Sequence, residues 1–205
     1  MKLFGLEMKK NSFYLVVFNL AYILGFIIYY IAIADYEFLV YVSFINILFL
    51  LVLVTINKTK FTNSILWLLS IAGFLHLFSG EIKINGAVLY QLDIVHIIGS
   101  GDSFVLRFDQ VMHFYGMFVM TIVAYHLISL YLAKDKNSNF IYFAAFFIGL
   151  GWGALVEIGE FITVLLFKYT GVGGYFNNAL DLVFDALGAL SAIILLYFKH
   201  KRLIK

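Results

Sequence analysis

The chain alternates long apolar runs with short polar segments. Six apolar runs can be followed, covering residues 13–34, 38–56, 64–79, 110–133, 140–167 and 180–198. A helix needs about 20 apolar residues to cross the hydrocarbon core of a bilayer, because each residue adds only about 1.5 Å. The third run is short, and tilt of its neighbours or local thinning of the bilayer would let it span. The pattern predicts an all-α, polytopic bundle of six transmembrane helices that forms a single integral membrane domain over residues 1–205.

The segment from Gly80 to Phe108, between the third and fourth runs, is the least apolar part of the chain. Ile82 and Ile84 alternate with polar or charged neighbours, which is typical of a short strand. The apolar residues between Val88 and Ile98 have the spacing of an amphipathic helix. We therefore expect an outer interfacial lid here rather than a seventh span, with a plain surface loop as the alternative.

Composition supports a membrane protein along the whole chain. Hydrophobic residues make up 63% of the 205 residues and charged residues 13%, whereas a soluble domain has about 25% charged residues. There is no cysteine, which excludes disulfides and thiolate metal sites. The first apolar run is too long for the core of a signal peptide and lacks a small-residue cleavage motif after it, so we interpret it as a retained span.

The basic residues are distributed unevenly between the two sides of the predicted bundle. One side carries eleven of them: Lys2, Lys9, Lys10, Lys58, Lys60, Lys134, Lys136, Lys199, Lys201, Arg202 and Lys205. The other side carries three: Lys83, Arg107 and Lys168. Loops rich in Lys and Arg stay in the cytoplasm. The sequence therefore predicts a multi-pass protein of the plasma (inner) membrane with both termini in the cytoplasm.

With this orientation, the polar side chains of four spans lie in the outer leaflet. They are His76 on the third span, Asp109 and His113 on the fourth, Glu157 and Glu160 on the fifth, and Asp181 and Asp185 on the sixth. The spacings of three or four residues place each pair on one helical face. An ionised carboxylate in hydrocarbon costs several kcal/mol. We therefore predict that these seven residues line one outer-leaflet cavity.

Carboxylates and imidazoles are ligands for hard or borderline cations. All seven residues are candidate ligands for Zn²⁺, Mn²⁺, Fe²⁺ or Mg²⁺. A divalent cation would explain how several acids share one desolvated place, since neighbouring carboxylates repel one another. In a catalytic site, Glu157 or Glu160 would be the base and Arg107 would bind an anionic head group of the substrate.

Three other interpretations of the same residues stay open. Asp109 and Asp181 come near the expected starts of their helices, where acids cap the helix and complement its dipole. The carboxyl groups can form a hydrogen-bonded network with His113 and Arg107. An ion or proton path is the third alternative.

Small residues predict that the fifth and sixth helices pack closely, because they let helix backbones approach. They are Ala145, Gly149 and Gly153 on the fifth span, and Gly188, Ala189 and Ala192 on the sixth.

These motifs resemble a known family. They are His76-x-x-x-Gly80, Arg107-x-Asp109-x-x-x-His113-x-x-Gly116, Glu157-x-x-Glu160-Phe161, and Asp181-x-x-x-Asp185 with Gly188-Ala189. Together they are similar to the YjdF-like inner-membrane proteins, a family of unknown function, and distantly similar to the VanZ-like membrane proteins. The resemblance covers about residues 75–192 and implies that these positions form a functional set. The family tends to have a basic residue after the Asp of the fourth helix, where this chain has Gln110.

The leading hypothesis is a metal-dependent hydrolase or transferase that acts on a lipid or lipid-linked substrate from the outer face. The alternative is a non-catalytic membrane protein that binds lipid or a small amphiphile. An ion-coupled transporter ranks third, because the inner halves of the helices carry no matching acids. Membrane lipids are the expected partners, and no nucleic acid is expected.

Overall fold

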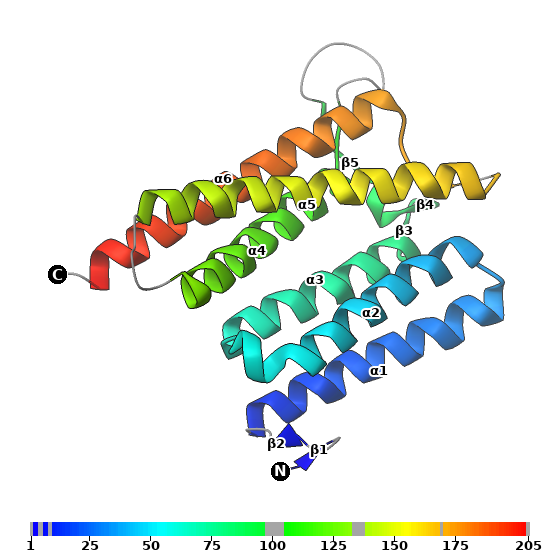
Figure 1. Ribbon diagram of the computed structural model, residues 1–205. Coiled ribbons are helices and arrows are strands. Elements are labelled where there is room, and N and C mark those ends of the chain that lie inside the picture. Colours follow the sequence, from blue (N-terminus) through cyan, green and yellow to red (C-terminus); the bar gives the residue numbers. More distant parts are fainter. Residues whose placement is uncertain are drawn as a thin grey trace. The chain divides into compact units, whose positions relative to one another are not determined.

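Six long helices follow one another along the chain, as the apolar runs predict (Figure 1). The computed structural model describes residues 2–3, 6–7, 10–96, 105–132, 138–168 and 170–203. Within this part, six helices are long and apolar enough to cross a membrane. They are α1 (Lys10–Ile33), α2 (Tyr36–Thr59), α3 (Asn63–Glu81), α4 (Phe108–Tyr131), α5 (Ser138–Leu166) and α6 (Tyr175–Leu203). The prediction of an all-α, six-span bundle is confirmed.

The helices expose large apolar side chains to their surroundings. Val54 is 75% exposed, and Ile28 and Leu165 are each 68% exposed. Large exposed apolar side chains are unfavourable in water, whereas hydrocarbon chains solvate them without cost. The exposed apolar side chains therefore fit a multi-pass membrane protein.

A β-hairpin follows α3. Strands β3 (Lys83–Ile84) and β4 (Ala87–Val88) pair antiparallel around Asn85 and Gly86. Both of these turn residues have positive φ angles, 53° and 88°. Asn-Gly is a strongly favoured pair for a two-residue turn of this kind, because Asn and Gly tolerate the left-handed region. The strand expected around Ile82 and Ile84 is thus present.

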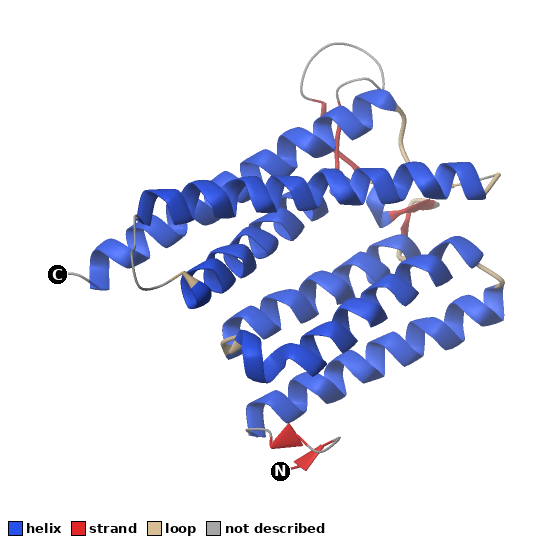
Figure 2. Ribbon diagram, in the orientation of Figure 1, coloured by secondary structure: helices blue, strands red, loops and turns tan. Residues whose placement is uncertain are grey.

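The prediction of an amphipathic helix from Val88 to Ile98 is wrong over the described residues. A single 3₁₀ turn, η1 (Leu89–Gln91), is followed by strand β5 (Asp93–His96), which pairs antiparallel with β6 (Val105–Arg107) (Figure 2). β-branched side chains such as Ile94 and Val95 fit a pleated ribbon. The pairing with β6, about ten residues further along the chain, decides for a strand over a helix here.

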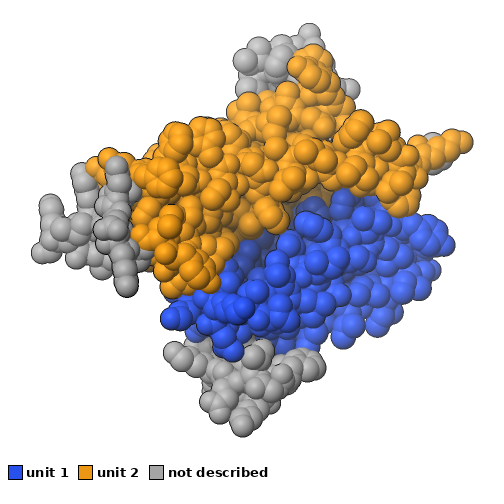
Figure 3. Space-filling model, in the orientation of Figure 1, with its two compact units in different colours: residues 1–80 blue, residues 81–205 orange. Residues whose placement is uncertain are grey.

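The chain divides into two compact units, residues 1–80 and residues 81–205 (Figure 3). The first contains β1 (Lys2–Leu3), β2 (Leu6–Glu7), α1, α2 and α3. Its core is built from side chains of all three helices: Tyr22, Ile23, Tyr30, Val42 and Leu77. The prediction of a single domain stays a prediction.

Interior polar groups of the first unit bind one another. The Asn19 amide donates to the Ser70 hydroxyl at 2.7 Å, and the Tyr22 hydroxyl donates to the Asn19 side-chain oxygen at 3.0 Å. The Tyr30 hydroxyl donates to the Leu77 carbonyl at 3.1 Å. These bonds tie α1 to α3 and leave the participating groups satisfied.

In the second unit, α4 packs against both α5 and α6. The contacts are close because glycines face them. A Cβ at Gly188 of α6 would collide with the backbone carbonyl of Phe114 on α4, and one at Gly149 of α5 would collide with the Thr121 side chain. The small residues of α5 and α6 therefore admit α4 between the two helices, in addition to the α5–α6 contact predicted from them.

We expect Gly188→Ala to destabilise the protein by about 1–3 kcal/mol, because the atom it meets belongs to backbone and cannot rotate away. Gly151→Ala is the matched control: it lies in α5, and a Cβ there has nothing within 4 Å. The control should be neutral or stabilising by up to about 1 kcal/mol through helix propensity. Thermal unfolding in detergent measures both, and equal midpoints would contradict the close α4–α6 contact.

Candidate functional site

His113 is the centre of a buried polar cluster in the second unit. It lies in the second turn of α4, and its side chain is 6% exposed. Carboxylates from α4, α5 and α6 approach its two ring nitrogens. Side chains of three helices thus meet at one imidazole, and the prediction that all seven candidate residues line one functional cavity stays a prediction.

Two carboxylates face the Nδ1 atom of His113. The distance from Nδ1 to Oδ1 of Asp185 is 3.1 Å, and that to Oε1 of Glu157 is 3.7 Å. Asp185 is fully buried and the Glu157 side chain is 11% exposed. We call His113 Nδ1, Glu157 and Asp185 the Nδ1 side of the site.

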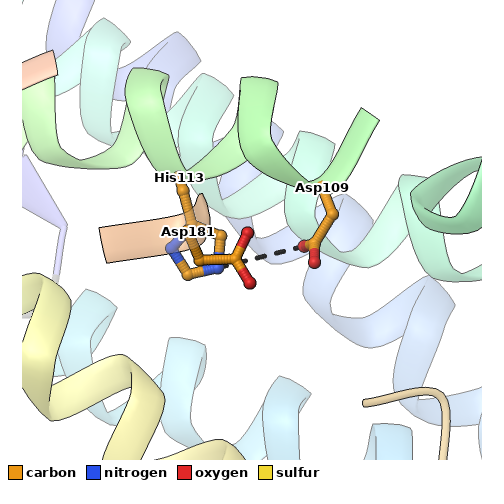
Figure 4. A group of neighbouring side chains, drawn as sticks. All are labelled: Asp109, His113 and Asp181. Carbon is orange, nitrogen blue, oxygen red and sulfur yellow. Dashed lines mark ion pairs between the residues drawn. The ribbon is translucent and has the colours of Figure 1, made fainter. Parts of the chain in front are cut away.

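Two more carboxylates lie on the opposite edge of the ring, and a third, that of Asp181, lies beside Asp109. The Nε2 atom of His113 is 3.8 Å from Oε1 of Glu160 and 3.9 Å from Oδ1 of Asp109. The fully buried Asp181 of α6 faces Asp109 and His113 of α4 (Figure 4). We call His113 Nε2, Asp109, Glu160 and Asp181 the Nε2 side.

Two amide side chains complete the Nε2 side, and sequence reasoning missed both of them. Nε2 of Gln110 donates to Oδ1 of Asp181 at 2.6 Å. Nδ2 of Asn177 donates to Oδ2 of Asp181 at 2.7 Å and to Oδ2 of Asp109 at 2.9 Å. The available signal for Asn177 was its position one turn before Asp181 on the same helical stripe. For Gln110 the only signal was that it stands where the resembled family tends to have a basic residue.

The two sides differ in how their oxygens are satisfied. Among the described residues, both carboxylate oxygens of Glu157 and Oδ2 of Asp185 are buried without a hydrogen-bond partner. Both oxygens of Asp181 accept hydrogen bonds. A buried acceptor that makes no bond loses its hydration without compensation, which costs about 1–3 kcal/mol and more for a charged group. The Nδ1 side therefore carries the buried carboxylate oxygens that make no hydrogen bond.

Gly153 makes room for the Nδ1 side. It lies one helical turn before Glu157 on α5, and a Cβ at this position would collide with the Asp185 carboxylate. Any larger residue would displace Asp185 or push α5 and α6 apart. The glycine thus has a positioning role as well as a packing role.

The structure changes the interpretation of Asp181. Helix α6 begins at Tyr175, about five residues before the predicted start, so Asp181 lies in its second turn. Capping groups act on the first turn only. Capping therefore does not account for Asp181, whereas Asp109 does lie in the first turn of α4.

Arg107 ends strand β6 directly before α4. Its Nε atom donates to Oδ1 of Asp93 on β5 at 3.2 Å, an ion pair between opposing residues of the hairpin. The binding of an anionic head group by Arg107 stays a prediction.

His76 belongs to the first unit, whereas the cluster around His113 belongs to the second. Its ring contacts the ring of Tyr41, edge to face, with centroids 5.6 Å apart. Its participation as a metal ligand stays a prediction.

The cluster contains two groups of side chains that could hold a metal ion. One is Asp109, His113 and Asp181, and the other is His113, Glu157 and Asp185. In each group, one ligand atom per residue lies within 4.8 Å of the others. Both groups offer two oxygens and one nitrogen, a donor set that suits Zn²⁺, Mn²⁺ or Fe²⁺.

Comparison with known proteins places the chain among membrane proteins of unknown function. The model of a family described as a predicted membrane protein, DUF2238, matches residues 14–202. An uncharacterized protein of Thermotoga maritima is 35% identical over 98 residues, which are 44% of this chain and 48% of that protein. The chain thus matches about half the length of this relative. No solved structure matches.

Replacing Gln110 tests the amide network. We expect Gln110→Leu to destabilise the protein by about 1–3 kcal/mol, because it leaves buried oxygens of Asp181 and Asn177 without their donor. Gln91→Leu is the control, since Gln91 is exposed in η1; it should change stability by less than about 0.5 kcal/mol. Chemical denaturation in detergent measures both variants. Equal stability of the two would show that Gln110 does not satisfy Asp181.

Proposed function

The chain belongs to the DUF2238 family of predicted membrane proteins, and from this starting point we propose that its buried cluster binds a divalent cation. With the cation bound, the protein would act as a hydrolase or transferase on a lipid or lipid-linked substrate. On the predicted orientation, the cluster opens to the outer leaflet. The resemblance of its motifs to YjdF-like proteins supports a functional set at these positions and names no reaction.

One observation carries the proposal: the Nδ1 side has three buried carboxylate oxygens without a partner among the described residues. They belong to Glu157 and Asp185, which both flank the same imidazole nitrogen. A cation would compensate all three at once, as buried charges require. A network made of protein groups alone leaves both Glu157 oxygens unbonded, so it explains less.

The distances suit a cation of moderate size. Ligands about 2.1 Å from a tetrahedral Zn²⁺ lie about 3.4 Å from one another. Nδ1 of His113 is 3.1 Å and 3.7 Å from the nearest oxygens of Asp185 and Glu157. With Nδ1 as a ligand, the Nε2 proton points toward Asp109 and Glu160, the kind of carboxylate contact that orients metal-binding histidines.

A divalent cation at this place would supply Lewis acidity toward a phosphoryl or ester oxygen and make water a better nucleophile. We assign Glu160 as the general base, because its side chain is 15% exposed and lies next to the ligand histidine. A base must reach the proton of an incoming water or hydroxyl group. Glu157 is assigned as a ligand, because its Oε1 atom lies 3.7 Å from Nδ1 and neither of its oxygens makes a hydrogen bond among the described residues.

An ion path is less well supported than a closed site. All acidic residues of α4, α5 and α6 belong to the cluster or lie close to it in sequence, and the segments 114–131, 138–156 and 186–203 contain none. A relay through carboxylates across the bilayer would need further acids along these segments.

The protein purified in detergent should retain about one equivalent of a transition metal, measured by elemental analysis. Glu157→Gln removes an anionic ligand and should weaken binding by more than about 100-fold, since even outer-shell changes cost about 10–100-fold. Glu160→Gln, three residues further along the same helix, removes only an outer contact of His113 and should weaken binding by no more than about 10–100-fold. The proposal fails if the wild-type protein and Glu160→Gln bind no Zn²⁺ or Mn²⁺ after dialysis against either ion.

Catalysis is tested separately from binding. Metal-loaded protein incubated with a total membrane-lipid extract should release inorganic phosphate or free fatty acid. Glu160→Gln should lower the rate by about 10²–10⁴-fold with the metal still bound, because general-base catalysis contributes that much. Metal binding without any release, in wild type and variant alike, would instead support the non-catalytic lipid-binding alternative.

A further inference from the structure

We infer that Gln110 and Asn177 restrict the site to one cation by occupying the carboxylate oxygens of the Nε2 side with N–H donors. The inference rests on the proposed function, because it assumes that the Nδ1 side binds a cation. It explains why Asp109, His113 and Asp181, the second group of candidate ligands, would not bind a second cation.

The two groups are alike in composition. Each combines His113 with two carboxylates, and each meets the same distance limit. Composition and distance alone would therefore predict a pair of cations on opposite edges of one imidazole ring. The amides are the difference: they contact Asp109 and Asp181, whereas Glu157 has no hydrogen-bond partner among the described residues.

The orientation of the two amides is fixed by the backbone. The N–H of Arg107 donates to Oε1 of Gln110 at 2.6 Å, and a backbone N–H cannot reverse its role. The NH₂ group of Gln110 therefore faces inward, where it donates to Oδ1 of Asn177 at 3.2 Å and to Asp181. With its own oxygen accepting this bond, Asn177 must direct its NH₂ group to Asp109 and Asp181.

These donors keep cations away in two ways. Each N–H engages an oxygen atom that a cation would need, on both oxygens of Asp181 and on one of Asp109. The positive ends of the amide dipoles also point toward the place where a second cation would lie. Because the amides carry no net charge, they compensate the carboxylates without adding a cation to the membrane interior.

Asn177→Asp tests the inference. The introduced carboxylate has the shape of the amide and can still accept the hydrogen bond from Gln110, but it replaces the two donated bonds with oxygen ligands. We expect the number of Mn²⁺ ions bound per chain to rise twofold, from about one to about two. Equilibrium dialysis of the full-length protein in detergent against Mn²⁺, with elemental analysis of both compartments, measures this number.

Gln110→Glu is the second variant, because it keeps the acceptor for the Arg107 N–H and removes the donors to Asn177 and Asp181. It should raise the number of bound ions in the same way, and it decides the matter if Asn177→Asp does not fold. Asn178→Asp is the matched control: it adds the same charge to the same turn of α6, one residue further round the helix. The control should stay at about one ion.

The outcomes separate this inference from the proposed function. If the wild-type protein binds one Mn²⁺ and the folded variants also bind one, the amides do not set the number of cations, while the proposed function stands. Two ions in the wild type, or a second ion in Asn178→Asp, overturn the inference likewise. A wild-type protein that binds no ion overturns the proposed function and this inference with it.

Discussion

The burial of several carboxylates around one imidazole is the constraint on which the second unit depends. Charges repel one another strongly where water is excluded, so each carboxylate needs its own compensation. The amides of Gln110 and Asn177 compensate Asp181 and share in compensating Asp109. The His113 ring lies against Asp185. Neither oxygen of Glu157 makes a hydrogen bond among the described residues, and the proposed cation is the group that would bind them.

Such a cluster forms only if three helices approach closely, and this couples helix packing to the chemistry of the site. Gly188 lets α6 reach the backbone of α4, and Gly153 gives the Asp185 carboxylate its place beside α5. The β5–β6 hairpin before α4 also holds the start of that helix, because the Phe108 N–H donates to the Leu92 carbonyl at 3.0 Å. The first turn of α4, which carries Asp109, is held in this way. The same residues therefore determine stability and geometry.

The first unit also buries polar side chains, but among its described residues none of them is charged. Its interior polar residues are neutral, and Asn19, Ser70 and Tyr22 bond to one another. Neutral hydrogen bonds between membrane helices contribute about 0.6 kcal/mol each on average. These hydrogen bonds are sufficient to align the helices. They satisfy the polar groups, so no ligand is needed to stabilise them. This contrast is the reason why we place the functional chemistry of the chain in the second unit.

The sequence by itself determined the six spans and the pairs of acids, because apolar run length and helical period are local properties. Local spacing also put Asp109 and His113 on one face of α4, and the two pairs of acids on single faces of α5 and α6. Only the tertiary structure decided the roles of Gln110 and Asn177, since the hydrogen bonds that join them across α4 and α6 link residues 67 to 71 positions apart in the chain. It also replaced the expected helix near Val88 with strand β5, whose partner β6 follows after a long gap, and assigned His76 to the other unit. Contacts between residues far apart in the chain produce no periodic pattern in the sequence. Residue spacing therefore identified the acids, but not the amide groups that donate hydrogen bonds to them.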